Sequence, residues 1–495
     1  MDQKDYSKKN ILVNFVWRLL ERFGAQGVTL IVSIILARLL DPTVYGTVAL
    51  VTVITTILQV FVDSGFGNAL VQKKDADDLD FSTVFTFNIA FSAILYALYF
   101  LLIPYITGFF GIQDTVSAMR VLGLIIIIAG FKGIQQAYVT KHLAYKKYFF
   151  ATLGGTITAA VVGITMAYLG YGIWALIVQN VVNQTIDTII LWVTIKWKPK
   201  LRFSLKRFKS LFSYGWKFLV TGFINQMYNE IRTLIIGKQY SSADLAFYNK
   251  GSQFPTVIAG NLTASIDSIL FPVMSEHQDD RERVKNITRR SISVGSYLLW
   301  PCMIGLAACS EPFILLLLSE KWISAVPYLQ IFCIVQAFYP IHSANLNAIK
   351  ALGRSDIYLY QDILKKASGF LIILLTMRFG VIWIALGCIL ANVVSQIINS
   401  FPNRKLLNYS WGQQLVDILP SLIISLVMGV FVYLVNFLNF SPVVTLLVQV
   451  PLGIGIYVGI SWLFKLSSFL YCADTLKKLI RSKKKNKEPL EDEEK

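Results

Sequence analysis

Apolar runs of about 20 residues alternate with short polar connections along almost the whole chain. A run of this length is what an α-helix needs to cross the hydrocarbon core of a bilayer. The pattern predicts roughly fourteen membrane-spanning helices, so the expected fold class is an all-α polytopic membrane protein. The predicted spans begin near Ile11, Thr43, Ser82, Thr115, Tyr148, Gly172, Leu211, Ala243, Ile287, Ala325, Ile357, Val381, Val416 and Pro442.

One predicted span carries an unusual stripe of polar residues, in the sequence "NVVNQTID" at 180–187. On a helix, its three amides and one carboxylate fall within about 100° of one another. Such a stripe cannot face hydrocarbon, because its polar groups would then have no hydrogen-bond partners. We therefore expect it to face other protein or a water-filled cavity. The four residues are Asn180, Asn183, Gln184 and Asp187.

The stripe has a counterpart, "NVVSQIIN" at 392–399, six predicted spans later. An offset of six spans preserves the direction in which the chain crosses the membrane. We therefore expect two pseudo-symmetric six-helix lobes around a central cavity, with two C-terminal helices appended. The matched positions are Asn180 and Asn392, Gln184 and Gln396, and Asp187 and Asn399.

The predicted domains follow this repeat and the charge pattern of the C-terminal tail. The tail changes from basic to acidic and is expected to be disordered and cytoplasmic. The four parts are residues 1–210 for the N-terminal lobe with a basic linker, 211–410 for the C-terminal lobe, 411–466 for the appended spans and 467–495 for the tail.

Polar residues on further spans are expected to line the same cavity. They are Arg18, Arg22 and Gln26 on the first span, Gln59 and Asp63 on the second, Asn225, Asn229, Glu230 and Arg232 on the seventh, and Lys250 on the eighth. A charge at the bilayer centre costs about 2.5–3.5 kcal/mol, which favours a hydrated interior. Other interpretations stay open: the first-span arginines could contact lipid headgroups, the carboxylates could be paired structurally, and the amides could join helices.

Composition and charge agree with a membrane protein. Of 495 residues, 55% are hydrophobic and 15% are charged, with a mean hydropathy of +0.58; soluble domains carry about 25% charged residues. The net charge of +17 could suggest nucleic acid, but no loop is long enough to fold into a binding domain. Most lysines and arginines lie at alternate span ends, which predicts that both termini are cytoplasmic.

The sequence gives little support for catalysis. The five cysteines form no CxxC motif, the three histidines have no metal-ligand spacing, and no P-loop or GxSxG motif occurs. We therefore expect no enzyme activity, no catalytic residues, no metal and no cofactor.

Several segments resemble the bacterial polysaccharide-biosynthesis flippases. They are "LARLLDPTVYGTVAL" at 36–50, "DSGFGNALVQKKD" at 63–75, "LAFYNKGSQFP" at 245–255, "FPVMSE" at 271–276 and "NAIKALGRSD" at 347–356. The resemblance covers about residues 8–470. It is greatest to the Wzx-type O-antigen repeat-unit exporters, in particular the colanic acid exporter branch, within the multidrug/oligosaccharidyl-lipid/polysaccharide superfamily.

This resemblance implies a function. The chain would translocate an undecaprenyl-diphosphate-linked oligosaccharide across the bacterial inner membrane by alternating access, for lipopolysaccharide, capsule or exopolysaccharide synthesis. It would act as a monomer among membrane lipids, with a polysaccharide polymerase and a chain-length regulator as implied partners and no nucleic acid. Two alternatives stay open: a multidrug or cation antiporter of the same superfamily, and a membrane polysaccharide polymerase.

The implied substrate assigns roles to the polar residues. Cations bind a diphosphate through charge-assisted hydrogen bonds, whereas amides suit sugar hydroxyls. The predicted diphosphate ligands are Arg18, Arg22, Arg232 and Lys250; the sugar-binding or cavity-lining residues are Gln26, Gln59, Asn180, Asn183, Gln184, Asn225, Asn229, Asn392, Gln396 and Asn399; the ion-coupling candidates are Asp63, Asp187 and Glu230. In related peptidoglycan flippases the two extra helices form a groove associated with the lipid tail, so the appended spans are expected to do likewise.

Overall fold

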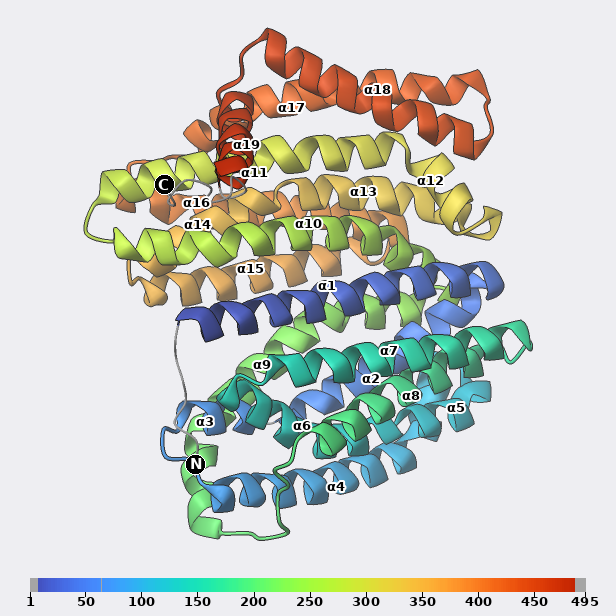
Figure 1. The fold of residues 1–495 in the computed structure, drawn as a ribbon. Helices are drawn as coiled ribbons and strands as arrows, with labels where there is room; N and C mark the ends of the chain where they lie inside the picture. The colour runs from blue at the N-terminus through green and yellow to red at the C-terminus, as the bar shows by residue number, and fades with distance from the viewer. Residues whose placement is uncertain (1–7, 64, 486–495) are drawn as a thin grey trace, which may run out of the picture. The chain divides into compact units, whose positions relative to one another are not determined.

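The computed structural model describes residues 8–63 and 65–485, without the side chains of residues 8–16, 18, 19, 21–23, 476 and 479–485. Within this part of the chain the regular structure is entirely helical, which confirms the all-α fold class (Figure 1). Eleven helices or runs of two or three consecutive helices in it are long and apolar enough to cross a membrane. The predicted number of fourteen spans is not confirmed by this criterion, because the helices at the first, seventh and eleventh predicted spans are not among the eleven.

The chain folds as two compact units, residues 1–246 and residues 247–495. Unit 1 contains α1 (Lys8–Leu39), α2 (Pro42–Asp63), α3 (Phe66–Gln72), α4 (Asp78–Phe110), η1 (Gln113–Thr115), α5 (Val116–Leu122), α6 (Leu124–His142), α7 (Tyr145–Tyr168), α8 (Ile173–Thr194) and α9 (Leu205–Gln239). The predicted N-terminal lobe ends at residue 210, whereas α9 packs against α2, α3 and α4 and so belongs to unit 1. The boundary at 210 follows the repeat rather than the packing, and it stays a prediction.

Unit 2 begins inside α10 (Ser242–Glu276). Its further helices are α11 (Arg281–Ala308), α12 (Ser310–Leu317), η2 (Glu320–Ala325), α13 (Val326–Ala337), α14 (Tyr339–Ala351), α15 (Ser355–Thr376), α16 (Val381–Leu406), α17 (Trp411–Leu434), η3 (Val435–Leu438), α18 (Pro442–Leu463) and α19 (Ser467–Lys485). The sequence predicts a disordered tail from residue 467, and the structure instead has α19 there. The difference arises because Leu466, Phe469 and Cys472 pack against the apolar core of this unit.

Small residues bring the helices of unit 1 close together. The face of α7 that packs on α8 contains Ala151, Gly155, Ala159 and Gly163. A Cβ atom on Gly155 would lie only 2.9 Å from the backbone oxygen of Asn183. Close backbone approach through small residues is how membrane helices gain packing energy where lipid supplies no hydrophobic drive.

The segment between α8 and α9, residues 195–204, forms no helix and lies against the start of α4. The backbone N–H of Lys200 donates to Ser82 Oγ at 3.1 Å, and that of Ser204 donates to Thr83 Oγ1 at 3.2 Å. These bonds satisfy backbone groups that helix formation would otherwise satisfy. The basic linker is therefore held on unit 1 by hydroxyls at the beginning of α4.

The break between α2 and α3 depends on Gly65. Its φ of +68° lies in the left-handed region, and a Cβ atom there would lie 2.3 Å from the backbone oxygen of Gly215 on α9. Any other residue would therefore meet both backbone strain and a collision. Gly65 fixes the turn that places Asp63 at the end of α2 and Asn68 on α3.

Gly65→Ala should destabilise the protein more than Gly111→Ala does. Gly111 has nearly the same φ, +71°, but a Cβ atom there would meet nothing within 4 Å. We expect about 1–2 kcal/mol of left-handed strain in both variants, and a further cost of about 1–3 kcal/mol from the collision at Gly65 alone. Thermal unfolding of the purified variants in detergent measures the difference. Equal losses of Tm would show that the close approach of α9 is unimportant.

Candidate functional site

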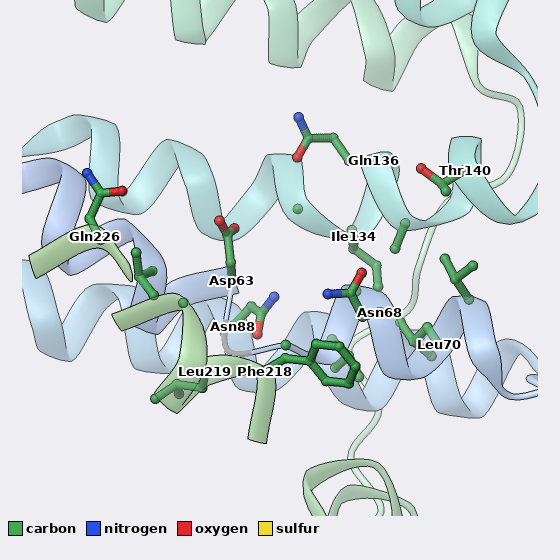
Figure 2. Close-up of a pocket in the computed structure, with 18 of the residues that line it drawn as sticks. Asp63, Asn68, Leu70, Asn88, Ile134, Gln136, Thr140, Phe218, Leu219 and Gln226 are labelled. Carbon is green, nitrogen blue, oxygen red and sulfur yellow. The ribbon is translucent and has the colours of Figure 1, made fainter. Parts of the chain in front are cut away.

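A cavity of about 540 Å³ lies inside unit 1, where α2, α3, α4, α6 and α9 meet (Figure 2). Amides predominate among its polar side chains, and no lysine or arginine among the described residues lines it. The polar side chains are Asp63 at the end of α2, Asn68 on α3, Asn88 on α4, Gln136 and Thr140 on α6, and Asn225 and Gln226 on α9. The cavity therefore offers many hydrogen-bonding groups and a single negative charge.

The cavity amides differ in how far the protein already satisfies them. Gln136 donates to the Tyr148 hydroxyl at 2.8 Å, and Gln226 donates to Glu230 Oε1 at 3.0 Å. Asn88, in contrast, is only 3% exposed, and its Oδ1 accepts no hydrogen bond from the described residues. Buried polar atoms are nearly always paired, so Asn88 presents an acceptor that a ligand group can satisfy.

Asp63 lies beside Asn88 at the wall formed by α6. A Cβ atom on Gly133 of α6 would be 3.9 Å from Asp63 Oδ1 and 3.8 Å from Asn88 Nδ2, so the glycine lets both side chains approach the helix. Asp63 is exposed to the cavity. A carboxylate in this position can accept hydrogen bonds from hydroxyls or attract a cation.

The polar stripe of α8 contacts one lysine of α6. Lys132 Nζ on α6 lies 2.7 Å from Asp187 Oδ2 and donates to Gln184 Oε1 at 2.8 Å. The side chains of Lys132 and Asp187 are only 12% and 3% exposed. The stripe therefore faces protein at these two positions, as its polarity requires in a membrane. Asn180 donates instead to the Leu176 oxygen of its own helix at 2.9 Å.

The same lysine interacts with the cavity carboxylate. Lys132 and Asp63 attract each other electrostatically, in addition to the short Lys132–Asp187 contact. One ammonium group in unit 1 thus acts on two carboxylates, through a short contact with Asp187 and through electrostatic attraction of Asp63. With both carboxylates ionised, this group of three side chains carries a net negative charge, which a proton or a bound cation would neutralise.

Unit 2 contains an equivalent arrangement around His342 on α14. Asn399 Nδ2 on α16 donates to His342 Nδ1 at 3.0 Å, His342 Nε2 donates to Asn392 Oδ1 at 2.9 Å, and Asn392 Nδ2 donates to the Val335 oxygen at 2.7 Å. This order of donors and acceptors is satisfied by a neutral imidazole. Asn399 is the repeat counterpart of Asp187. A lysine–carboxylate pair in one unit is therefore replaced by an imidazole–amide pair in the other.

The remaining predicted site residues are scattered. Arg232 on α9 lies 5.5 Å from the centre of the Tyr228 ring. Lys250 on α10 is buried, donates to Gln253 Oε1 at 3.1 Å, and lies 5.8 Å from the centre of the Trp322 ring. Arg18 and Arg22 are on α1, but their side chains lie outside the described residues. Asn183, Gln26, Gln59 and Glu230 are half-buried, Asn229 is exposed, and Gln396 is buried with neither amide atom bonded to a described residue.

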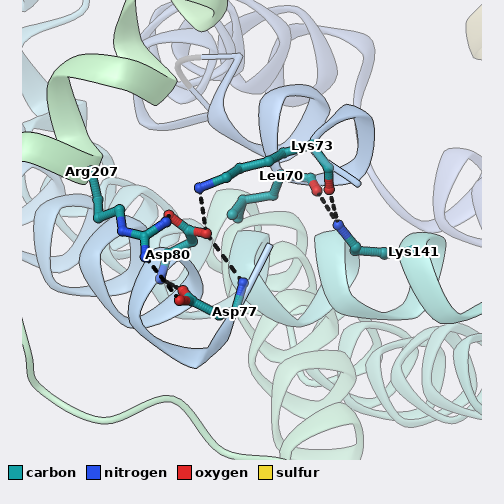
Figure 3. A network of polar contacts seen from close by, with 6 residues as sticks. All are labelled: Leu70, Lys73, Asp77, Asp80, Lys141 and Arg207. Carbon is teal, nitrogen blue, oxygen red and sulfur yellow. Dashed lines mark hydrogen bonds and ion pairs between the residues drawn. The ribbon is translucent and has the colours of Figure 1, made fainter. Parts of the chain in front are cut away.

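Charged groups next to the cavity join α3 to α4 and α6 (Figure 3). Lys141 on α6 donates to the Leu70 oxygen at 2.8 Å and also to the Lys73 oxygen, so it caps the C-terminal end of α3. Lys73 in turn pairs with Asp80, which is fully buried, at 2.6 Å. These bonds hold α3, and with it Asn68, in place.

Arg207, at the start of α9, joins this network by pairing with Asp77 at the start of α4. Its Nη2 lies 3.1 Å from Asp77 Oδ2 and its Nη1 lies 3.5 Å from Asp80 Oδ1. Asp77 is the N-cap of α4 and forms a capping box with Asp80. The backbone N–H of Asp80 holds the pKa of the Asp77 carboxyl below its ordinary value, and Arg207 and Lys73 lower it further.

Unit 2 has an apolar groove of about 460 Å³ between the appended helices α17 and α18 and the helices α10, α11 and α12. Its walls include Met428 and Val432 of α17 and Leu446, Ile454 and Val458 of α18. Polar atoms are scarce along it, so it suits a hydrocarbon chain rather than a polar ligand.

Sequence reasoning missed the two basic groups that bind the polar stripes. Lys132 is the only charged residue in the apolar run "LIIIIAGFKGIQQAYV" at 124–139, which should have marked it as functional or paired. His342 lies 210 residues later, close to the offset of 212 between the two stripes, and Gln135 and Asn345, both amides, are also 210 residues apart. The internal repeat therefore contained the signal, although the similarity is weak.

Comparison with known proteins identifies the family. Residues 35–327, more than half of the chain, match the family described as "Polysaccharide biosynthesis protein". The chain belongs to the polysaccharide biosynthesis protein family. The predicted resemblance is thereby confirmed, and two relatives illustrate how far the similarity extends.

The teichuronic acid biosynthesis protein TuaB of Bacillus subtilis is 27% identical over 316 residues, which are 62% of this chain and 64% of that protein. The chain thus aligns with somewhat less than two thirds of TuaB. The lipopolysaccharide biosynthesis protein WzxC of Escherichia coli is 24% identical over 423 residues, 82% of this chain and 84% of that protein. The solved structure of the lipid II flippase MurJ, in an inward closed conformation, has a TM-score of 0.76 at 16% identity and covers 91% of this chain and 98% of its own. The likeness to this solved structure shows that the chain has the same fold as MurJ.

Exchanging the unit 1 pair for the unit 2 pair should preserve stability better than removing one partner. Asp187→Asn removes the carboxylate that Lys132 contacts at 2.7 Å, and breaking a buried ion pair costs about 3–5 kcal/mol. Lys132→His combined with Asp187→Asn should recover at least half of the lost Tm, because it reproduces the imidazole–amide pairing of His342 and Asn399. Thermal unfolding of the wild type, both single variants and the double variant gives the coupling between the two sites.

Asp362→Asn provides the control for this cycle. It removes one carboxylate from the more exposed Lys366–Asp362 pair, which should cost less than about 1 kcal/mol. If Asp187→Asn costs no more than Asp362→Asn, the Lys132–Asp187 pair does not stabilise unit 1.

Proposed function

We propose that this chain is a flippase that moves an undecaprenyl-diphosphate-linked oligosaccharide repeat unit across the cytoplasmic membrane by alternating access. The product would enter lipopolysaccharide, capsule or exopolysaccharide synthesis. The observation that carries the proposal is the amide-rich cavity inside unit 1. Membrane helices rarely expose several amides to a common space unless a polar substrate or ion occupies it.

The chemistry of the cavity suits the sugar head group. Sugar hydroxyls both donate and accept hydrogen bonds, and Asn68 and Asn88 offer both kinds of group. Asp63 accepts from hydroxyls but would repel a diphosphate. The cavity therefore favours the oligosaccharide over the phosphates of the same molecule.

The relatives support this assignment through their names. TuaB is named for teichuronic acid biosynthesis, WzxC for lipopolysaccharide biosynthesis, and MurJ as a lipid II flippase. The apolar groove of unit 2 provides a second kind of support, because a lipid-linked sugar also carries a hydrocarbon tail. We propose that α17 and α18 hold this tail.

The diphosphate needs cations, and we propose that Arg18, Arg22, Arg232 and Lys250 supply them. Arg232 lies 5.5 Å from the centre of the Tyr228 ring, and Lys250 donates to Gln253 at 3.1 Å and lies 5.8 Å from the centre of the Trp322 ring. Arginine suits this role because its planar fork can bind a phosphate through two parallel hydrogen bonds.

Ion coupling is proposed for the carboxylates Asp63, Asp187 and Glu230. The shared lysine supports Asp63 in particular, because Lys132 already holds Asp187 at 2.7 Å. Asp63 therefore faces the cavity with an incompletely compensated charge. Transport by an Asp63→Asn variant should lose its dependence on an imposed proton or sodium gradient.

The same carboxylate favours a second candidate function, a multidrug or cation antiporter. An antiporter would bind its cationic substrate at Asp63 and would need none of the cavity amides. The transport assay below separates the two functions, because it reports lipid-linked oligosaccharide and not cation movement.

We propose that both termini are cytoplasmic and that Lys200 lies on the same side, in the bacterial inner membrane. The clustering of positive charge in residues 196–209 supports this orientation. A cysteine placed at residue 200 of a variant without native cysteines should resist an impermeant thiol reagent added to intact cells.

Substituting two cavity amides, one of which has an unsatisfied acceptor, should impair export. We expect Asn68→Ala with Asn88→Ala to lower polysaccharide export at least about tenfold in a flippase-null strain, because each lost hydrogen bond is worth about 0.5–1.5 kcal/mol and a buried partner is left unsatisfied. Protein abundance is measured in parallel. Gln113→Ala, which removes an exposed amide outside the cavity, is the matched control and should export normally. Normal export by the double variant would exclude the cavity as the sugar site.

Removing the proposed cations should abolish export without affecting the fold. We expect Arg22→Ala and Arg232→Ala each to block transport, and Lys at either position to restore it only in part, because lysine lacks the bidentate fork. A fluorescent lipid-linked oligosaccharide in proteoliposomes measures the rate directly. If both alanine variants transport normally, the diphosphate is bound elsewhere; if they fail to accumulate in the membrane, these arginines are structural.

A further inference from the structure

A second polar pocket lies in unit 2, between the start of α11, the start of α17 and the first turns of α19. Its volume is about 610 Å³. Three membrane-spanning helices have their ends here, because α11 begins at Arg281, α17 begins at Trp411 and α18 ends at Leu463, four residues before α19. The pocket is therefore at one boundary of the membrane. The function proposed above gives it no role.

One arginine of the pocket is fully compensated by a carboxylate. Arg289 binds Asp417 through two hydrogen bonds of 2.7 Å, from Nε and from Nη2. The Tyr409 hydroxyl also donates to Asp417 Oδ2 at 2.8 Å, so the carboxylate is fixed on the wall of the pocket. The charges of Arg289 and Asp417 therefore cancel, and their two hydrogen bonds fix both side chains on the pocket wall.

The neighbouring arginine has no such compensation. The guanidinium of Arg290 lies 4.9 Å from the centre of the Tyr471 ring of α19, and no carboxylate pairs with it among the described residues. The lining therefore contains two arginines and one aspartate, which leaves a net positive charge. The contact with Tyr471 restrains Arg290 at the pocket without neutralising it.

Helix α19 adds to the positive potential. It has 19 residues, and its first turn, at Ser467, forms part of the pocket wall. The N-terminal end of a helix carries partial positive charge and unpaired N–H groups. Ser468 is joined to Ser293 of α11 by a hydroxyl contact of 2.7 Å, which fixes the helix start against the pocket.

The direction and sequence of α19 place it along the membrane surface. Figure 1 shows α19 running across the direction of α11 and α17. Its inner face is apolar, at Phe469 and Cys472 next to the preceding Leu466, while Lys477 and Lys478 are exposed. A basic amphipathic helix of this kind lies in the interfacial region, at the depth of lipid phosphates.

We propose that this pocket binds a phosphate group, with Arg290, Asn286 and the first turn of α19 as its ligands. A phosphate is favoured over a carboxylate because a tetrahedral anion can accept from the guanidinium fork, an amide and a helix N-terminus at once. The group is carried either by an anionic phospholipid or by a soluble phosphate. The proposal is independent of the transported substrate, since it concerns binding alone.

The test compares ligands on the purified full-length protein in detergent. Thermal stabilisation is titrated with short-chain phosphatidylglycerol, short-chain phosphatidylcholine and inorganic phosphate. We expect the wild type to bind phosphatidylglycerol more tightly than phosphatidylcholine, because the choline cation neutralises the phosphate charge and would be repelled by the net positive pocket. Arg290→Gln should weaken binding of phosphatidylglycerol about tenfold. Arg283→Gln is the matched control: it removes the same charge from an exposed site on α11 outside the pocket, and should change binding less than about twofold.

A second variant tests the site without removing a structural group. Ser467→Asp adds a negative charge to the first turn of α19, where an acidic residue favours the helix. Its Tm without ligand should therefore be unchanged or higher, while its affinity for phosphatidylglycerol falls about tenfold. If this region had only a structural role, Ser467→Asp would not lower the affinity for phosphatidylglycerol while leaving the Tm unchanged or higher.

The outcomes distinguish the sources of the phosphate. Stabilisation by phosphatidylglycerol alone identifies a lipid head group, and stabilisation by inorganic phosphate as well identifies a site open to soluble anions; both support the proposal. Equal affinities for phosphatidylglycerol and phosphatidylcholine, with no effect of inorganic phosphate, would overturn it. So would equal weakening by Arg290→Gln and Arg283→Gln, because binding would then depend on overall charge.

Discussion

The polar interior of unit 1 depends on the ammonium group of Lys132. In a bilayer, every polar group of a helix must find its partner within the protein, since lipid supplies none. Lys132 satisfies this constraint for Asp187 and Gln184 at 2.7 and 2.8 Å, and it also attracts Asp63. One cation therefore links α6 to α8 and acts on the carboxylate that faces the cavity. Its position makes helix packing and cavity electrostatics inseparable in this unit.

The two units satisfy the same constraint with different chemistry. Asp187 and Asn399 occupy equivalent positions in the repeat, and each contacts a basic side chain on the helix packed against it. The lysine pairs with a carboxylate there, whereas the histidine accepts a hydrogen bond from an amide, so the residue types at the two positions differ together. The asymmetry of Asp187 and Asn399 is thus explained by their partners. Of Asp63 and Asp187, Asp63 is the carboxylate whose charge is less compensated.

Sequence could predict the helices and the polar stripe but not the partners of the stripe. Apolar length and helical periodicity are local properties, and they were sufficient for the all-α fold and for the expectation that Gln184 and Asp187 avoid lipid. Lys132 is 52 residues from Gln184 in the chain, so their contact depends on how α6 packs against α8. The cavity depends on packing in the same way, because Asn68, Asn88 and Gln226 come from three different helices. Of the predicted site residues, Asp63 and Asn225 line it.

The charges of the cavity argue for separate sites for the parts of an amphipathic substrate. A space with amides and one carboxylate can bind neutral sugars, while it disfavours an anion through Asp63. A hydrocarbon chain would leave those amides unsatisfied, so it is better placed in the groove between α17, α18 and their neighbours. The diphosphate, which joins sugar to lipid, then requires cations outside both spaces, such as Arg232 or Lys250. Each part of the proposed substrate thus has its own group of side chains, and none of these groups could bind another part equally well.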